Sequence, residues 1–410
     1  MRDPASSHYV GLDIGTSTVR CVVGMLDPNN PGKLSIIGHG SAPNYGMRKG
    51  VVVHVDDAAE AIVQAITEAE RVSGTHIQQA TVNINGAHVS GLNSKGVIAI
   101  SAANREITQE DRFRVEEAAT IVQLPSNREI IQVFAKNYRL DGQDNIKDPV
   151  GMHGVRLEVD THIVTAATPN LRNLDMALEK AQVLPNHHTI SSLASAEAVL
   201  ERQQKEAGTV LIDIGAGTTN IVVFEDGEVQ HVAVLPIGGS YITNDLAIGL
   251  KTDLDIAEAV KITHAGVAQK LLKKEFRVRV KDKDYFFDAE EVYMITEARV
   301  EEMFELVEKE LQRIRRSRKL PGGVVLVGGT AKLPGMAEFA KAKLQLAARI
   351  GALHGVSGLI DTVSDPSYAS ATGLMMLDML LMPEVNNSHG QHQTARALNF
   401  MDSLWRRIKG

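Results

Sequence analysis

Residues 10–23 read VGLDIGTSTVRCVV, and residues 210–223 read VLIDIGAGTTNIVV. The two stretches lie 200 residues apart and are identical at seven of fourteen aligned positions, which include an Asp, a Gly and a Thr. Each is an apolar run that ends in Asp-Ile-Gly, passes through a short polar turn and continues as a second apolar run, which predicts a β-hairpin. Two similar hairpins this far apart indicate a duplicated domain with a cleft between the halves.

The residue types of both turns suit the binding of phosphate. Glycine permits positive φ and a close approach of the backbone to a ligand, and the N–H groups of a turn form an anion-binding nest. Hydroxyl groups add donors, and a carboxylate at each strand end can hold Mg²⁺ through its waters. The alternative is a pair of ordinary hairpins, and the matching residues in both turns argue against it. The predicted nucleotide ligands are Asp13, Gly15, Thr16, Ser17, Thr18, Asp213, Gly215, Ala216, Gly217, Thr218 and Thr219, with Mg²⁺ near Asp13 and Asp213.

The composition is typical of a globular protein and excludes several classes. The chain has 410 residues, a net charge of -7, 44% hydrophobic and 23% charged residues, so we expect about two to four domains or subdomains. The acidic balance argues against a nucleic-acid partner. The single cysteine, Cys21, excludes an internal disulfide or a Cys metal cluster and fits a reducing compartment. We expect no signal peptide and no membrane span, because no run approaches about 18 apolar residues.

Helix and strand patterns alternate along the chain, which predicts α/β architecture. Residues 81–100 alternate like paired strands, and Thr108 followed by Asp111 predicts a capping box at the start of a helix. A long charged helix over 289–318 ends in an Arg-rich run. We interpret these basic residues as solvent-exposed side chains whose positive charge is favourable near the helix C-terminus. The alternative is that they contact a partner.

Five motifs in order resemble the actin/heat-shock-chaperone/hexokinase superfamily of ATP-binding proteins. They are its two phosphate motifs at 10–24 and 208–224, its adenosine motif at 324–336, and its two interdomain connecting helices at 192–200 and 366–377. The resemblance implies an actin-like two-lobed fold, with duplicated ribonuclease-H-like domains around a nucleotide cleft that holds ATP and Mg²⁺.

The adenosine side of this expected site rests on two stretches. In the first, a Val-rich strand ends at Gly328, Gly329 and Thr330, so that base and ribose can lie against bare backbone. In the second, residues 257–266 place Glu258 and Lys261 near the adenosine by resemblance. An i,i+3 surface ion pair is the alternative for these two residues.

Within the superfamily the chain resembles the FtsA family of bacterial cell-division proteins over essentially its full length. Residues 85–167 stand where that family carries an inserted subdomain, and 257–266 resembles its Ala-Glu-x-x-Lys-x-x-His-Gly pattern with one extra residue before the Gly. The expected organisation is a first lobe over 1–84 and 168–190, an inserted α+β subdomain over 85–167, a second lobe over 191–382 with a smaller subdomain at 237–320, a linker over 383–395 and a terminal helix over 396–410.

The terminal helix is amphipathic. At about 100° per residue, the bulky apolar side chains from Ala397 to Ile408 fall on one side, and Arg407 and Lys409 lie at its two edges. Such a helix suits the interface of an anionic membrane, and docking on a protein surface is the alternative. The predicted membrane-binding residues are Leu398, Phe400, Met401, Leu404, Trp405, Arg406, Arg407, Ile408 and Lys409.

The resemblance and the tail together predict an actin-like ATP-binding cell-division protein that polymerises on the cytoplasmic face of the cell membrane at the septum. It would anchor filaments of FtsZ there as a peripheral protein and meet later membrane proteins of the division machinery. The alternatives are an FtsA-like pilus assembly protein and a metabolic kinase or phosphatase of the same superfamily. We expect at most weak ATPase activity. Glu197, on the first connecting helix, is a candidate water-orienting residue, with a plain polar hinge residue as the alternative.

Overall fold

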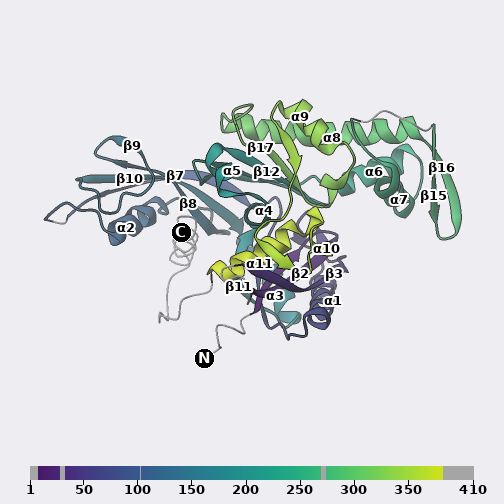
Figure 1. The fold of residues 1–410 in the computed structure, drawn as a ribbon, viewed down its shortest axis with the longest axis horizontal. Coiled ribbons are helices and arrows are strands. Elements are labelled where there is room, and N and C mark those ends of the chain that lie inside the picture. The colour runs from purple at the N-terminus through teal and green to yellow at the C-terminus, as the bar shows by residue number, and fades with distance from the viewer. Residues whose placement is uncertain (1–7, 28–32, 102, 269–273, 382–410) are drawn as a thin grey trace.

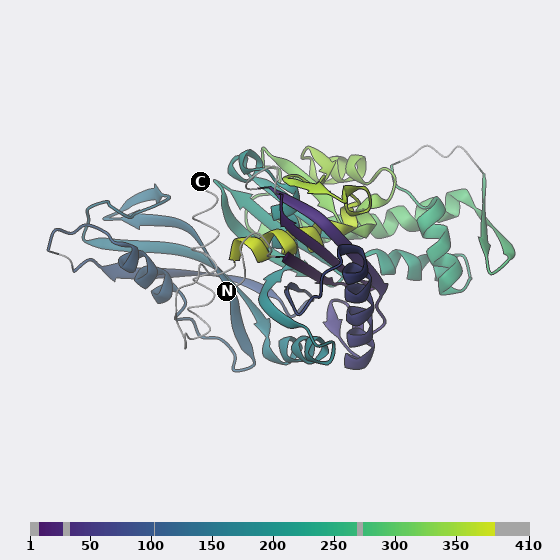
Figure 2. The ribbon, with the colours of Figure 1, turned by 60° about the horizontal axis from the view of Figure 1, so that its bottom comes forward.

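The computed structural model describes residues 8–27, 33–101, 103–268 and 274–381. It is an elongated α/β molecule in which two large sheets occupy the middle (Figure 1). A third sheet forms one end of the molecule, and a helical subdomain with a β-hairpin forms the other. These two parts remain at opposite ends after the rotation shown in Figure 2.

The sheet of the first lobe has six strands. Their order is β11 (Leu184–Ile190), β6 (Gln79–Ile84), β1 (His8–Ile14), β2 (Thr18–Leu26), β3 (Leu34–Pro43) and β19 (Val356–Gly358). α1 (Val55–Ser73) covers β2 and β3, and its seven buried residues are Ala or Ile at helical spacing, as expected for an amphipathic helix against a sheet. α3 (Thr168–Lys180) packs beside α1, near the short strands β4 (Met47–Arg48) and β5 (Val51–Val52).

The sheet of the second lobe repeats the start of the first. Its order is β14 (Glu228–Leu235), β13 (Thr219–Glu225), β12 (Thr209–Ile214), β17 (Gly323–Val327) and β18 (Ala348–Ile350). Asp13 is paired with Arg20 across the β1–β2 hairpin, and Asp213 with Asn220 across β12–β13, so the offset of 200 residues also holds in the strand register. The sequence repeat is therefore a structural repeat.

Helices fill out the second lobe on one side. They are α5 (Arg202–Ala207), α6 (Gly239–Gly249), α7 (Leu254–His264), α8 (Ala289–Arg313) and α9 (Met336–Leu344), with the hairpin β15 (Glu275–Val280) and β16 (Lys283–Asp288) at the far end. The buried apolar residues of α6, α7, α8 and α9 form one cluster with β12, β13 and β17, whereas the one buried residue of α5 is Lys205, which lies over the ring of Phe224. The long helix α8 spans this lobe and ends close to the edge strand β14, because His231 of β14 lies 3.0 Å from Glu310 of α8.

The inserted subdomain is a separate four-stranded sheet, in the order β7 (Ser90–Ala99), β10 (Arg156–Ala167), β8 (Arg128–Leu140) and β9 (Gln143–Ile146). α2 (Gln109–Ala119) packs on it and starts with the predicted capping box, since Thr108 and Asp111 exchange both hydrogen bonds. The prediction that strands within 81–100 pair with each other is wrong. β6 runs parallel to β1 in the first lobe, whereas β7 pairs with β10 in the insert. A strand-like pattern indicates a strand and does not indicate which strand it pairs with.

Two helices cross between the lobes. α4 (Ser191–Val199) and α11 (Ala369–Leu381) approach so closely that a Cβ on Gly373 would lie 1.7 Å from the carbonyl oxygen of Ala194. The expected second lobe ran from 191 to 382 without interruption. The structure differs, because β19 pairs with β3 and α11 packs on β1, so the last part of this range lies with the first lobe. α10 (Ile360–Val363) lies between these two elements.

Among the described residues, no helix combines the length and the apolar character that crossing a membrane requires. The predicted linker at 383–395 and the predicted membrane-binding helix at 396–410 lie outside the described residues.

Candidate functional site

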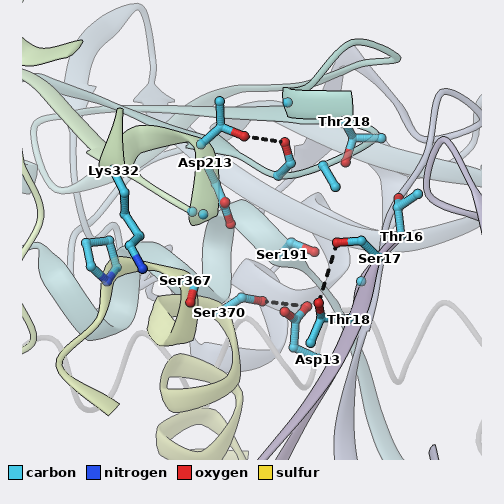
Figure 3. Close-up of a pocket in the computed structure, with 18 of the residues that line it drawn as sticks. Asp13, Thr16, Ser17, Thr18, Ser191, Asp213, Thr218, Lys332, Ser367 and Ser370 are labelled. Carbon is cyan, nitrogen blue, oxygen red and sulfur yellow. Dashed lines mark hydrogen bonds between the residues drawn. The ribbon is translucent and has the colours of Figure 1, made fainter. Parts of the chain in front are cut away.

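A cavity of about 420 Å³ lies between the two lobes (Figure 3). Its walls are the β1–β2 turn of the first lobe, the β12–β13 turn of the second, the segment that follows β17, and the first residues of α11. Its size falls within the range of ligand pockets, roughly 300–1,000 Å³. The strand ends of both halves of the repeat therefore converge on one site.

The two hairpin turns have the same internal geometry. In the first, the N–H of Gly15 donates to the carbonyl of Thr18 at 3.2 Å, and in the second, Gly215 donates to Thr218 at 2.9 Å. The turns also approach each other, because a Cβ on Gly217 would lie 2.7 Å from Oγ1 of Thr16. A side chain at position 217 would push the two lobes apart at the point where phosphate groups are expected.

The first carboxylate is held by partners from two other elements. Nδ2 of Asn83, on β6, donates to Oδ1 of Asp13 at 2.7 Å, and Oγ of Ser370, on α11, donates to the same oxygen at 3.2 Å. Asn83 also accepts from the N–H of Ile14 at 2.7 Å and donates to Oγ of Ser191, on α4, at 3.0 Å. Asn83 thus links the first hairpin to a connecting helix.

The second carboxylate is tied to the same connecting helix. Oγ of Ser195, on α4, donates to Oδ2 of Asp213 at 2.8 Å. Burial raises the pKa of Asp213 to about 6, and the charge of Asp13 adds to this rise. Burial likewise raises the pKa of Asp13, although the Arg20 guanidinium and the bonds from Ser370 and Asn83 act in the opposite direction.

These two buried carboxylates fit a divalent cation. Each is costly to ionise alone, and a nearby Mg²⁺ reverses this balance because it stabilises the charged form. Mg²⁺ usually keeps several waters and takes only one or two carboxylates from the protein, which is what Asp13 and Asp213 offer. Their arrangement is suited to orienting a hydrated cation beside the two turns.

A further part of the cavity lining consists of backbone and an ion pair. Gly328 has φ of +88°, and a Cβ there would lie 2.5 Å from Oδ1 of Asp213, so only glycine fits. Oγ1 of Thr330 donates to the carbonyl of Gly215 at 2.9 Å, which joins this wall to the second turn. Nζ of Lys261 donates to Oε2 of Glu258 at 2.6 Å, and both side chains line the cavity. The i,i+3 ion pair therefore forms and also faces the site.

The cavity brings together all but two of the predicted nucleotide ligands. Gly217 and Thr219 are not among its lining residues, since Gly217 faces Thr16 and the hydroxyl of Thr219 donates to the carbonyl of Ile237. Glu197 accepts from Nζ of Lys205 at 2.7 Å and does not line the cavity, which favours the plain polar role for it.

Sequence reasoning missed the residues that position the carboxylates, above all Asn83. The signal was a polar residue near the end of an otherwise mostly apolar run, where a buried side chain needs hydrogen-bond partners. The alternation of residues 81–100 predicted only paired strands.

Comparison with known proteins decides the family. A model described as "Cell division protein FtsA" matches residues 210–373, and one described as "SHS2 domain inserted in FTSA" matches residues 86–165, which is the inserted subdomain. Cell division protein FtsA of Pseudomonas aeruginosa is 37% identical over 371 residues, covering 90% of this chain and 88% of that protein. The chain belongs to the FtsA family. The FtsA proteins of Bacillus subtilis and Escherichia coli are 38% and 31% identical, over 90% and 89% of this chain and 82% and 89% of their own length.

Solved structures show the actin-like fold expected of an FtsA protein. A PilM–PilN type IV pilus biogenesis complex has a TM-score of 0.64 at 18% identity and covers 90% of this chain and 98% of that chain. MreB5 of Spiroplasma citri bound to ADP has a TM-score of 0.54 at 12% identity, covering 92% and 97%. At these identities the likeness concerns the fold alone.

Proposed function

We propose that this FtsA-family chain binds ATP with Mg²⁺ in the interlobe cavity, polymerises on the cytoplasmic face of the cell membrane and anchors FtsZ filaments there at the division site. The observation that carries the proposal is the pair of Asp-Ile-Gly hairpins that face one cavity from the two lobes. A ligand that contacts both turns favours the closed arrangement, because only that arrangement offers both sets of contacts.

Several groups support the nucleotide part of the proposal. The turn N–H groups and hydroxyls suit the β- and γ-phosphates, and Asp13 and Asp213 suit the hydrated Mg²⁺. The solved structure of MreB5, which shares the fold, contains ADP. By resemblance to the FtsA family we propose at most weak ATP hydrolysis.

A binding experiment tests this part. Asp213→Ala should weaken Mg²⁺-dependent ATP binding at least tenfold, because a lost charge-assisted contact costs about 1.5–3 kcal/mol. Glu305→Ala is the matched control, since Glu305 is an exposed carboxylate in the middle of α8. Equal ATP affinity of both variants and the unaltered chain would remove the nucleotide part.

Filament formation is supported by the fold and by avidity. MamK, a solved structure with a TM-score of 0.51 at 14% identity that covers 91% of this chain and 98% of that chain, is described as a double helical filament. A single short amphipathic helix binds a membrane reversibly, and a filament that carries many such helices gains avidity. We therefore propose that polymerisation and membrane attachment reinforce each other.

Sedimentation with liposomes tests membrane attachment. The full chain should sediment with vesicles that contain anionic lipid in the presence of ATP, and more strongly with FtsZ added. Truncation after Met382, or Leu404→Glu together with Trp405→Glu, should abolish this sedimentation. Vesicle binding that survives the double substitution would contradict the role of the tail.

The smaller subdomain of the second lobe is the proposed FtsZ contact, by resemblance to the family. Exposed apolar side chains support this, because Ile248 on α6 and Met294 on α8 are 77% and 62% exposed, and the two helices pack together. Ile248→Glu with Met294→Glu should reduce FtsZ recruitment to vesicles without changing the chain's own vesicle binding. Unchanged recruitment would place the FtsZ contact elsewhere.

A further inference from the structure

A second cavity, of about 300 Å³, lies at the joint between the inserted subdomain and the second lobe. Its walls come from β7, β8 and β10 of the insert, from β14, and from the segment where α8 ends. None of these residues belongs to the nucleotide cavity. The Arg-rich run at the end of α8, which the proposed function leaves without a role, reaches this joint.

The charged side chains that line this cavity are all basic. They are Lys136, Arg313, Arg315 and Arg316, and none of its described lining residues is an Asp or a Glu. Four cations around one small recess repel each other unless an anion lies among them. This is the pattern of a site that is completed by a negatively charged ligand.

Two of the four cations already have carboxylate partners behind the wall. Nε of Arg316 donates to Oε2 of Glu225 at 2.8 Å, and NH1 of Arg313 donates to Oε2 of Glu310 at 3.4 Å. Arg315 forms no ion pair with any described residue. The paired arginines are thus held in place, and Arg315 keeps its guanidinium for another partner.

Lys136 is the second cation without a salt bridge inside the described part of the chain. Burial lowers its pKa, Asp160 and Glu225 nearby raise it, and Arg316 lowers it. Burial makes the charged form of an ammonium costly unless an anion lies beside it. A ligand oxygen in the cavity would add to the stabilisation that Asp160 and Glu225 already give the charged form.

Two histidines lie in the wall, and one of them, His162, is neutral and held by two hydrogen-bond partners. Nδ1 of His162 lies 2.8 Å from Oδ1 of Asn93, and Nε2 accepts from the N–H of Val232 at 3.1 Å. The ring can satisfy both partners only when Nδ1 carries the proton, and burial lowers the pKa of His162 to about 3. His231 lies against it with ring centres 5.5 Å apart. His162 therefore holds this part of the wall in place before any ligand enters.

Arg315 occupies a backbone position that normally belongs to glycine. After α8 the N–H of Arg316 donates to the carbonyl of Leu311 and the N–H of Arg315 donates to that of Gln312, which is the Schellman arrangement. Arg315 has φ of +59°, in the left-handed region that side chains disfavour. Arg318, three residues later, has φ of +58° and does not line the cavity.

We propose that this cavity is a second anion site, which takes a phosphate group through Arg315 and Lys136. A guanidinium matches two phosphate oxygens at once, and an ammonium contributes a point charge beside it. The phosphate can belong to a soluble small molecule or to a lipid headgroup, and the chemistry at the cavity is the same. The proposal does not depend on nucleotide in the interlobe cavity.

A matched pair of variants tests the proposal. Arg315→Gly and Arg318→Gly each remove one positive charge and each relieve one left-handed residue, so both should keep or raise the melting temperature. Inorganic phosphate is titrated into the full chain by calorimetry, with chloride adjusted to hold ionic strength constant. Neither substitution touches the interlobe cavity, so both variants should bind phosphate there with equal affinity. A difference in phosphate affinity between the two variants therefore reports the second site.

The unaltered chain and Arg318→Gly should bind phosphate with the same affinity, and Arg315→Gly should bind it about tenfold more weakly, as the loss of a charge-assisted contact predicts. Lys136→Gln should also weaken phosphate binding. Equal phosphate binding by Arg315→Gly and Arg318→Gly, or no saturable binding by any form, would overturn the proposal.

A second arm identifies the source of the phosphate. The same variants are sedimented with vesicles of phosphatidylcholine and with vesicles that also contain phosphatidylglycerol. If Arg315→Gly sediments less than Arg318→Gly only with the vesicles that contain phosphatidylglycerol, the result supports the site and assigns it to a lipid headgroup. A loss seen only with inorganic phosphate supports the site and assigns it to a soluble ligand.

Discussion

Replacing Asp213 by Asn should change the pH dependence of stability in a defined way. The carboxyl is buried, and its pKa is raised from 3.8 to about 6, first by burial and then by Asp13. Since one pH unit of pKa corresponds to about 1.36 kcal/mol, a rise of about two pH units amounts to ~3 kcal/mol. Asn has nearly the same shape and can still accept the hydrogen bond from Ser195, but it cannot ionise.

The sign follows from proton binding in the two states. The folded chain binds this proton more tightly than the unfolded chain, so the contribution to stability is full below about pH 4 and is lost as the pH rises through about 6. Urea unfolding in EDTA at pH 4 to 8 measures this effect. Relative to Asp213→Asn, the unaltered chain should lose up to ~3 kcal/mol of unfolding free energy across that range.

Two further measurements separate the two causes of the raised pKa of Asp213, which are burial and the charge of Asp13. Asp13→Asn removes the neighbouring charge, so the loss of stability through Asp213 should shrink and shift to lower pH. Mg²⁺ with ATP should restore stability to the unaltered chain at pH 7 and have less effect on Asp213→Asn, because the cation favours the ionised carboxylates. Parallel pH profiles for the unaltered chain and Asp213→Asn would refute the reasoning.

Three other predictions concern the helix crossing, the adenosine side of the cavity and the C-terminal tail. Gly373→Ala places a methyl group 1.7 Å from the carbonyl oxygen of Ala194, so it should cost about 1–3 kcal/mol in chemical unfolding, and an unchanged midpoint would contradict the close crossing. Lys261→Ala should weaken ATP binding more than inorganic pyrophosphate binding, as expected of a residue on the adenosine side, and calorimetry with both ligands measures the difference. The emission of Trp405, the single tryptophan, should shift to the blue on addition of anionic vesicles, whereas an unaltered spectrum would argue against insertion of the tail.

Much of the site could be predicted from the sequence because of the repeat. A repeat constrains the position of each residue in a hairpin, which composition does not. Identical residues at a constant offset specify the same hairpin register, and in the structure Ile14 pairs with Val19 as Ile214 pairs with Thr219. Since both hairpins begin their lobes in the same way, their turns meet at equivalent edges of the two sheets. Gly328 was also predicted, because it follows a Val-rich run that resembles the adenosine motif, and in the structure this run is a strand beside β12.

Other features depend on contacts between distant parts of the chain, and the local sequence does not indicate which partners they have. Asn83 binds Asp13 and Ser191, which lie 70 and 108 residues away, and nothing in the strand around Asn83 indicates either partner. β19 follows the second lobe in sequence but pairs with β3 in the sheet of the first lobe. A strand of three residues is too short for its sequence pattern to show which sheet it joins. Tertiary packing decides both.

The inserted subdomain is covalently part of the first lobe, yet it also touches the edge of the second, where His162 accepts the backbone N–H of Val232. Within the described residues the lobes are thus fastened in two regions, one around the crossing of α4 and α11, where the N–H of Gly328 also donates to the carbonyl of Pro366 at 3.0 Å, and one at this edge. A rigid body that is pinned to another at two points keeps a single rotational freedom, about the line that joins the points. The two fastenings therefore define the axis of any opening of the nucleotide cavity, and movement about another axis requires the bond from Val232 to His162 to break first.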